Sequence, residues 1–106
     1  MKQYLDKDQT AKLIELGFPK PQSIVDVDVD YSIRDHTIYN AYSIGELIEL
    51  LPKEITDEYD EVTSLEFNTT EVYYTNLRVM SYYKNSAELI DALFDMCVTL
   101  KEEGVI

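Results

Sequence analysis

Three aspartates on alternate positions, Asp26, Asp28 and Asp30, are the residues of this chain best spaced to bind a metal ion. They match the first three ligand positions of a calcium-binding loop. The match then fails, because Tyr31 stands where the loop needs its turn glycine and Thr37 stands where it needs a bidentate glutamate. Alternate residues of a strand are also about 6.6 Å apart along it. The pattern therefore predicts a solvated acidic strand face and no metal site.

Apart from the acids, the side chains most suited to catalysis or metal binding are a single cysteine and a single histidine. Cys97 lies between Met96 and Val98 in an apolar helical pattern, which is typical of a buried and unreactive thiol. His36 has no second histidine with which to build a metal site, and the chain has no glycine-rich phosphate loop. We therefore expect no catalytic residue, no cofactor and no enzymatic activity.

The charge of the chain is its strongest compositional feature. Twenty-one Asp and Glu residues oppose nine Lys and Arg residues, which gives a formal net charge of −12 over 106 residues. This charge repels the nucleic-acid backbone and anionic lipid, so we expect no direct nucleic-acid binding and no membrane binding. The start of the chain lacks an apolar signal core, and one cysteine cannot form an internal disulfide. These features predict a cytoplasmic protein that binds another protein, either a basic one or one that itself binds nucleic acid.

Two acidic segments and a group of tyrosines form the predicted partner surface. The first segment is the aspartate face of residues 25–31, and the second is the loop over residues 56–61. Exposed tyrosine adds contact area at low entropic cost, so tyrosines near residues 73–83 join the prediction. The candidate residues are Asp26, Asp28, Asp30, Asp57, Glu58, Asp60, Glu61, Tyr73 and Tyr82.

The acidic surplus has two other interpretations. The simplest is a solvated surface that only keeps the protein soluble. The second is mimicry of DNA, although phosphates that repeat at about 3.4 Å per strand match aspartates on a β-strand only loosely. A separate alternative for the chain as a whole is a structural homodimer formed by pairing of edge strands.

Capping signals and apolar periodicity predict three helices. Asp6 begins a short helix and Ser43 begins a second, each followed three residues later by a side chain that completes a capping box. A long helix is expected from about Ser86 to Glu103, with Asn85 as its capping residue. The side of this helix that we expect to be buried includes Leu89, Leu93, Met96 and Leu100.

Runs of β-forming residues predict strands over residues 25–31, 64–67, 71–74 and 77–83. We expect a tight turn at Thr75 and Asn76, which would place Tyr73 beside Arg78 for a cation–π contact. The sequence does not define the secondary structure of residues 32–41, although residues 37–39 are a candidate for the second strand of a hairpin.

These elements predict an α+β fold in a single domain over residues 1–106. Three or four strands would form an antiparallel sheet packed against the long C-terminal helix and the two shorter helices. The sheet would bury one face under the helices and leave the other in water.

Three stretches of the helical regions carry a resemblance: residues 13–19 (LIELGFP), 42–55 (YSIGELIELLPKEI) and 88–104, from ELIDAL through KEEG. Together they resemble a group of small uncharacterised proteins from phages and mobile elements of anaerobic gut bacteria. The resemblance implies a cytoplasmic accessory protein with a mixed helix–sheet fold. It transfers no catalytic residue, and it does not include residues 25–30.

Overall fold

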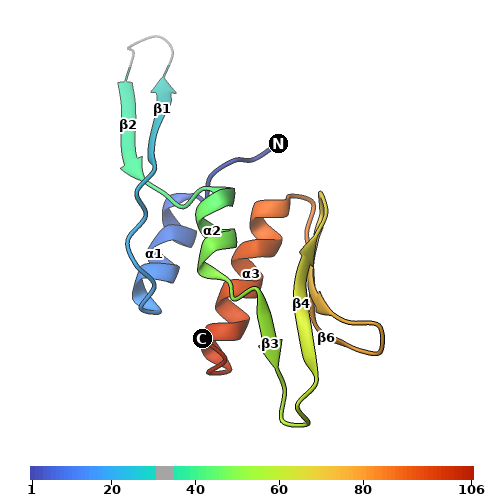
Figure 1. The fold of residues 1–106 in the computed structure, drawn as a ribbon. Coiled ribbons are helices and arrows are strands. Elements are labelled where there is room, and N and C mark those ends of the chain that lie inside the picture. Colours follow the sequence, from blue (N-terminus) through green and yellow to red (C-terminus); the bar gives the residue numbers. More distant parts are fainter. Residues whose placement is uncertain (31–34) are drawn as a thin grey trace.

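A computed structural model describes residues 1–30 and 35–106, together with their side chains apart from residues 26–30 and 35–38. In this part of the chain three helices combine with two antiparallel sheets, so the predicted α+β class is confirmed (Figure 1). The elements are α1 (Lys7–Glu15), β1 (Ile24–Asp30), β2 (Asp35–Asn40), α2 (Ile44–Leu50), β3 (Glu54–Thr56), β4 (Val62–Phe67), β5 (Glu71–Thr75), β6 (Met80–Asn85) and α3 (Leu89–Glu102).

The larger sheet is a four-stranded antiparallel meander in the order β3-β4-β5-β6. Its strands follow one another in sequence, so each pair is joined by a hairpin connection. Alternation along β5 turns Val72 and Tyr74 toward the helices, where both are fully buried. Residues of the opposite face, such as Glu66 on β4 and Tyr83 on β6, remain exposed. The sheet therefore has one face in the core and one face in water.

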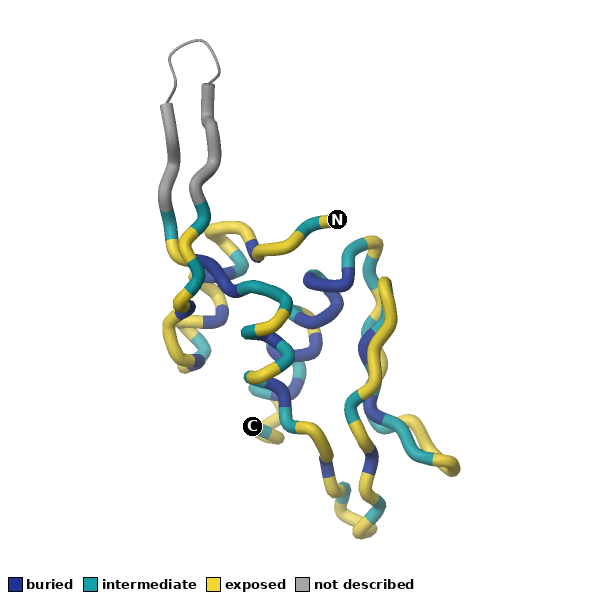
Figure 2. Tube along the Cα trace, turned by 45° about the horizontal axis from the view of Figure 1, so that its top comes forward, coloured by how far each residue is buried: buried dark blue, intermediate teal, exposed yellow. Residues whose placement is uncertain are grey.

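Helix α3 supplies the largest share of the core. Figure 2 shows the buried residues gathered along this helix and on the parts of α2 and the sheet that face it. The four positions predicted to be buried on α3 are confirmed. Cys97 is also fully buried, and burial raises the pKa of its thiol to about 12. The thiol therefore stays protonated near neutral pH, as expected of an unreactive cysteine.

Both predicted capping boxes are present. The Asp6 carboxylate accepts a hydrogen bond of 2.8 Å from the Gln9 backbone N–H, and the Gln9 side chain accepts one of 3.1 Å from the Asp6 N–H. Ser43 and Glu46 form the same reciprocal pair at the start of α2, with both bonds at 3.2 Å. Local sequence alone is sufficient to define where these two helices begin.

The predicted start of α3 is wrong. Asn85 was expected to cap the helix, but it belongs to β6 and lies opposite Glu71 of β5. The sheet also holds the next residue, because the Ser86 N–H donates to the Thr70 carbonyl at 3.0 Å. The helix begins only at Leu89, and its N-cap residue Glu88 makes no capping hydrogen bond with its side chain.

The predicted turn between the last two strands is also wrong. The Asn76 side chain accepts hydrogen bonds from the N–H groups of Arg78 at 2.7 Å and Val79 at 2.9 Å, which stabilises a longer loop. Strand β6 therefore starts at Met80, and Tyr73 lies opposite Tyr83 on the neighbouring strand. The expected contact between Tyr73 and Arg78 is not compatible with this register.

The strand expected over residues 25–31 pairs with residues 35–40 and forms a sheet of its own. Val25 lies opposite Tyr39 and Val27 opposite Thr37, so the candidate hairpin through residues 37–39 is confirmed in its backbone. This hairpin extends away from the helices and from the larger sheet (Figure 1). The expected position of Tyr31 on one face of the strand lies outside the described residues.

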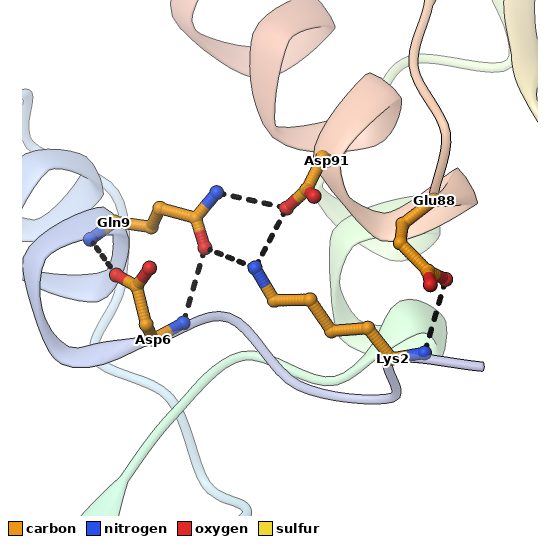
Figure 3. Close-up of polar contacts among 5 residues, drawn as sticks. All are labelled: Lys2, Asp6, Gln9, Glu88 and Asp91. Atoms are coloured by element: carbon orange, nitrogen blue, oxygen red, sulfur yellow. Dashed lines mark hydrogen bonds and ion pairs between the residues drawn. The ribbon is translucent and has the colours of Figure 1, made fainter.

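A polar cluster ties the N-terminal segment to α3 (Figure 3). The Lys2 amine donates to Gln9 at 2.9 Å and to Asp91 at 2.8 Å, and the Gln9 amide donates to the same Asp91 oxygen at 2.9 Å. The Lys2 backbone N–H donates to the Glu88 carboxylate at 3.0 Å. Gln9 thus takes part both in the capping box of α1 and in the hydrogen bond to Asp91 of α3. These two contacts fix the position of α1 relative to α3.

Replacement of a buried α3 residue should destabilise the protein. Leu93 is fully buried, so Leu93→Ala should lower the free energy of unfolding by about 2–5 kcal/mol through lost burial and a cavity. Urea denaturation followed by circular dichroism measures this change. Leu77→Ala is the matched control, because Leu77 is fully exposed and should leave the unfolding free energy nearly unchanged. Equal effects of the two substitutions would contradict the core described above.

The polar cluster should contribute stability that depends on pH. Burial alone would raise the pKa of Asp91, but hydrogen bonds from Lys2 and Gln9 and the Lys2 charge hold it below its ordinary value. A carboxyl with a lowered folded-state pKa stabilises the fold above its unfolded pKa of about 3.9 and loses this effect as pH falls through the folded value. Asp91→Asn should therefore cost about 0.5–1 kcal/mol at pH 7.

This cost should shrink as pH falls below the unfolded pKa of about 3.9 and should vanish only below the lowered folded-state pKa of Asp91, where both proteins are neutral at that position. Urea titrations at a series of pH values measure it. Asp60→Asn, which removes an exposed carboxylate from the β3–β4 connection, is the control at pH 7. A cost for Asp91→Asn that persists undiminished in acid would rule out a role for the charge.

Candidate partner-binding surface

The two predicted acidic segments lie at opposite ends of the molecule (Figure 1). Asp26, Asp28 and Asp30 belong to β1 in the projecting hairpin, and their side chains lie outside the described part of the structure. The acidic loop, residues 57–61, connects β3 to β4 at the other end of a molecule 58 Å long. The predicted acids therefore do not form one continuous patch.

The acidic loop has a defined backbone conformation. The Asp57 carboxylate accepts hydrogen bonds from the N–H groups of Tyr59 at 2.8 Å and Glu61 at 2.9 Å. Asp60 adopts a positive φ of 63°, a left-handed conformation that aspartate tolerates better than most residues. Asp57 thus holds the loop, whereas the Glu58 and Asp60 side chains are exposed.

A surface groove brings part of this loop together with β6 and the C-terminal end of α3. Its volume is about 630 Å³. Alternation along the strands turns Ile55 and Tyr82 into it from the helix-covered face of the sheet. The groove is lined by Ile55, Thr56, Asp57, Glu58, Ser81, Tyr82, Glu103, Gly104 and Val105.

The electrostatics of the groove favour a cation. Asp57, Glu58 and Glu103 contribute three carboxylates, and none of the lining residues that the structure describes is Lys or Arg. The C-terminal end of α3 adds a partial negative charge from its unpaired carbonyl groups. Lys101, the basic residue in the last turn, places its amine 5.3 Å from the centre of the Phe18 ring instead. We call this region the acidic groove.

Tyr82 and Tyr73, the two predicted tyrosines, lie on opposite faces of the sheet. Tyr82 faces the helices and packs edge-to-face on buried Tyr74, with ring centroids 6.4 Å apart. Burial raises the pKa of the Tyr82 hydroxyl, and the neighbouring Glu103 carboxylate raises it further. Tyr73 lies on the exposed face beside Tyr83, so it takes no part in the acidic groove.

Glu103 is the functional candidate that the sequence did not reveal. It stands next to Gly104, which has a positive φ of 75° and ends the last turn. Nothing in the local sequence relates Glu103 to Glu58, which precedes it by more than forty positions. The proximity arises because α3 packs across the sheet and ends near the β3–β4 connection.

A second hollow of about 470 Å³ lies beside α2. Its Glu46 carboxylate already accepts hydrogen bonds from the N–H of Gln22 at 2.9 Å, the hydroxyl of Ser23 and the N–H of Ser43. Burial opposes ionisation of Glu46, but these bonds outweigh it and lower the pKa of the carboxyl. Lys20 also lines this hollow, so its charges are partly balanced. The acidic groove is the stronger candidate.

Neither a metal-binding cluster among the described residues nor a match to a known protein indicates what this protein does. Within residues 1–30 and 35–106, no group of three or more His, Cys, Asp or Glu side chains is placed to hold a metal ion. No helix in that part of the chain is long and apolar enough to cross a membrane. No protein-family model, no curated protein and no solved structure matches the chain. The function is therefore inferred from the geometry and charge of the acidic groove.

The structural role of Asp57 can be separated from its charge. Asp57→Ala should destabilise the protein by about 1 kcal/mol, because two loop N–H groups lose their acceptor. Asp57→Asn removes the same charge but keeps an acceptor oxygen, so it should cost less than half as much. Urea denaturation of the two variants provides the comparison. Equal costs would mean that the carboxylate charge, and not the acceptor, stabilises the loop.

Proposed function

We propose that this protein is a small acidic accessory protein that acts by binding a basic protein partner and performs no catalysis. The observation that supports this proposal most directly is the acidic groove, which Asp57, Glu58 and Glu103 line without a cation among the described lining residues. The proposed role is cytoplasmic and belongs to phages or mobile elements, as the sequence resemblance implies.

The geometry of the acidic groove suits a lysine or arginine side chain of the partner. Glu58 and Glu103 line the groove from two different elements, so basic side chains of one partner could pair with both sides of it. The Tyr82 ring lines the same space and offers an aromatic face for a cation–π contact, worth about 0.5–1 kcal/mol at an exposed site. The net charge of −12 would also speed encounter with a basic partner.

The separation of the two acidic segments weighs against mimicry of DNA. A mimic must present carboxylates in a continuous row to fill a groove that binds a phosphate backbone. Here the β1 aspartates and the β3–β4 loop lie at opposite ends of the long axis. A partner that inserts basic side chains into one groove fits this distribution better than a partner that binds DNA along its length.

Charge-removing substitutions in the acidic groove should weaken binding of a basic probe. The probe is a fluorescently labelled peptide of alternating lysine and threonine, and its binding is measured by fluorescence anisotropy. The double variant Glu58→Gln/Glu103→Gln should bind about tenfold more weakly, which corresponds to about 0.7 kcal/mol for each exposed charge pair. Binding should also weaken as salt rises, because the screening length is only about 10 Å at 0.1 M.

The matched control is Glu15→Gln/Glu49→Gln, which removes the same charge from exposed positions on α1 and α2. This variant should bind the probe nearly as well as the unmodified protein. If both double variants weaken binding equally, net charge alone attracts the probe and the surface serves solubility. A triple Asp26→Asn/Asp28→Asn/Asp30→Asn variant tests the hairpin in the same assay.

A further inference from the structure

Strand β6 leaves one edge of the four-stranded sheet open. It is the last strand in the order β3-β4-β5-β6, and no strand in the described part of the chain pairs with its outer side. The Ser86 N–H donates to the Thr70 carbonyl, so by the alternation of an antiparallel ladder the N–H and C=O groups of Tyr83 and Asn85 point away from β5. These groups are available to another strand.

The opposite edge of the sheet is protected in ways that β6 is not. Strand β3 has only three residues, follows Pro52 and leads into the acidic loop. Short length, proline and charge are the features by which proteins prevent edge strands from pairing. Strand β6 has six residues and contains neither proline nor an acid, although its register shifts by a bulge near Ser81.

The charge pattern singles out the same strand. Residues 72–87 form the longest stretch of the chain without Asp or Glu, and they contain Arg78 and Lys84. In a protein of net charge −12, the strand itself adds no like charge to a contact with a second copy, and the carboxylates beside it are Glu71, which accepts from the Tyr83 hydroxyl, and Glu103. Met80 and Tyr83 add apolar surface, since they are 54% and 44% exposed on the water-facing side of the sheet.

We propose that β6 pairs with β6 of a second copy of this chain in an antiparallel, two-fold symmetric arrangement. An isologous contact of this kind joins the two sheets into one continuous sheet and closes the assembly as a dimer. The register places Tyr83 opposite Tyr83 of the second copy, because its backbone groups face the free edge. This inference does not rest on the proposed binding of a basic partner.

This register makes the two copies complementary in charge. Lys84 shares the helix-covered face with Tyr82, as their opposite residues Val72 and Tyr74 are both buried there. With Tyr83 at the two-fold axis, Lys84 lies opposite Tyr82 of the second copy, beside the Glu103 that raises the Tyr82 pKa. The Lys84 ammonium group of each copy therefore lies close to Glu103 of the other copy.

Sedimentation velocity over a range of protein concentrations tests this proposal. The unmodified chain should form dimers, and the dimer should tighten as salt rises, because screening reduces repulsion between two highly acidic chains. This salt dependence is opposite to that expected for the basic probe, so the two proposals can fail separately. A chain that stays monomeric at all concentrations and salt levels overturns the dimer.

Two substitutions of the same type locate the contact. Tyr83→Glu places two carboxylates against each other at the two-fold axis and should weaken association at least tenfold. Tyr59→Glu adds the same charge at an 80% exposed tyrosine in the β3–β4 connection and should leave association close to that of the unmodified chain. A dimer that withstands Tyr83→Glu would overturn the β6 contact.

Spin labels provide a second readout that does not depend on Tyr83→Glu folding correctly. Labels on Tyr83→Cys should show a short distance between the two copies, whereas labels on Tyr59→Cys should show a much longer one. Buried Cys97 should remain unlabelled in the native protein, so it does not interfere. A longer distance at position 83 than at position 59 would overturn the proposed register.

Discussion

The packing of α3 against the sheet is the contact on which the rest of the structure depends. Leu93, Met96 and Leu100 are fully buried on this helix, and Val72 and Tyr74 are fully buried on the strand that faces it. The Tyr74 hydroxyl extends this contact, because it donates to the Pro52 carbonyl at 2.7 Å and so links β5 to the connection between α2 and β3. Fully buried side chains of this size account for most of the stabilisation available to a small domain.

The same packing produces the acidic groove. Helix α3 ends near the β3–β4 connection, and its carboxylate Glu103 joins Asp57 and Glu58 there. These acids and the C-terminal end of α3 give the groove a negative electrostatic environment. The proposed basic partner would complement this charge. The groove and strand β6 share Ser81 and Tyr82, so the two proposed surfaces are neighbours.

The sequence predicted those elements whose signals are local. The capping boxes at Asp6 and Ser43 were correct because each depends on groups only three residues apart. The buried side of α3 was correct because its apolar periodicity leaves one face for the core. Two predictions failed where tertiary contacts compete with local signals. Asn85 is held in the β6 ladder instead of capping α3, and Asn76 stabilises a longer loop than the expected tight turn.

The sequence by itself determined the α+β class, the helix starts that capping boxes define, and the surplus of charge, because all of these follow from composition and short-range periodicity. Only the tertiary structure decided which acids meet. It separated Asp26, Asp28 and Asp30 from the β3–β4 loop, and it brought Glu103 to that loop from the far end of the chain. The physical reason is that pairing of strands and packing of α3 act between residues distant in sequence, where neither spacing nor composition carries information about proximity.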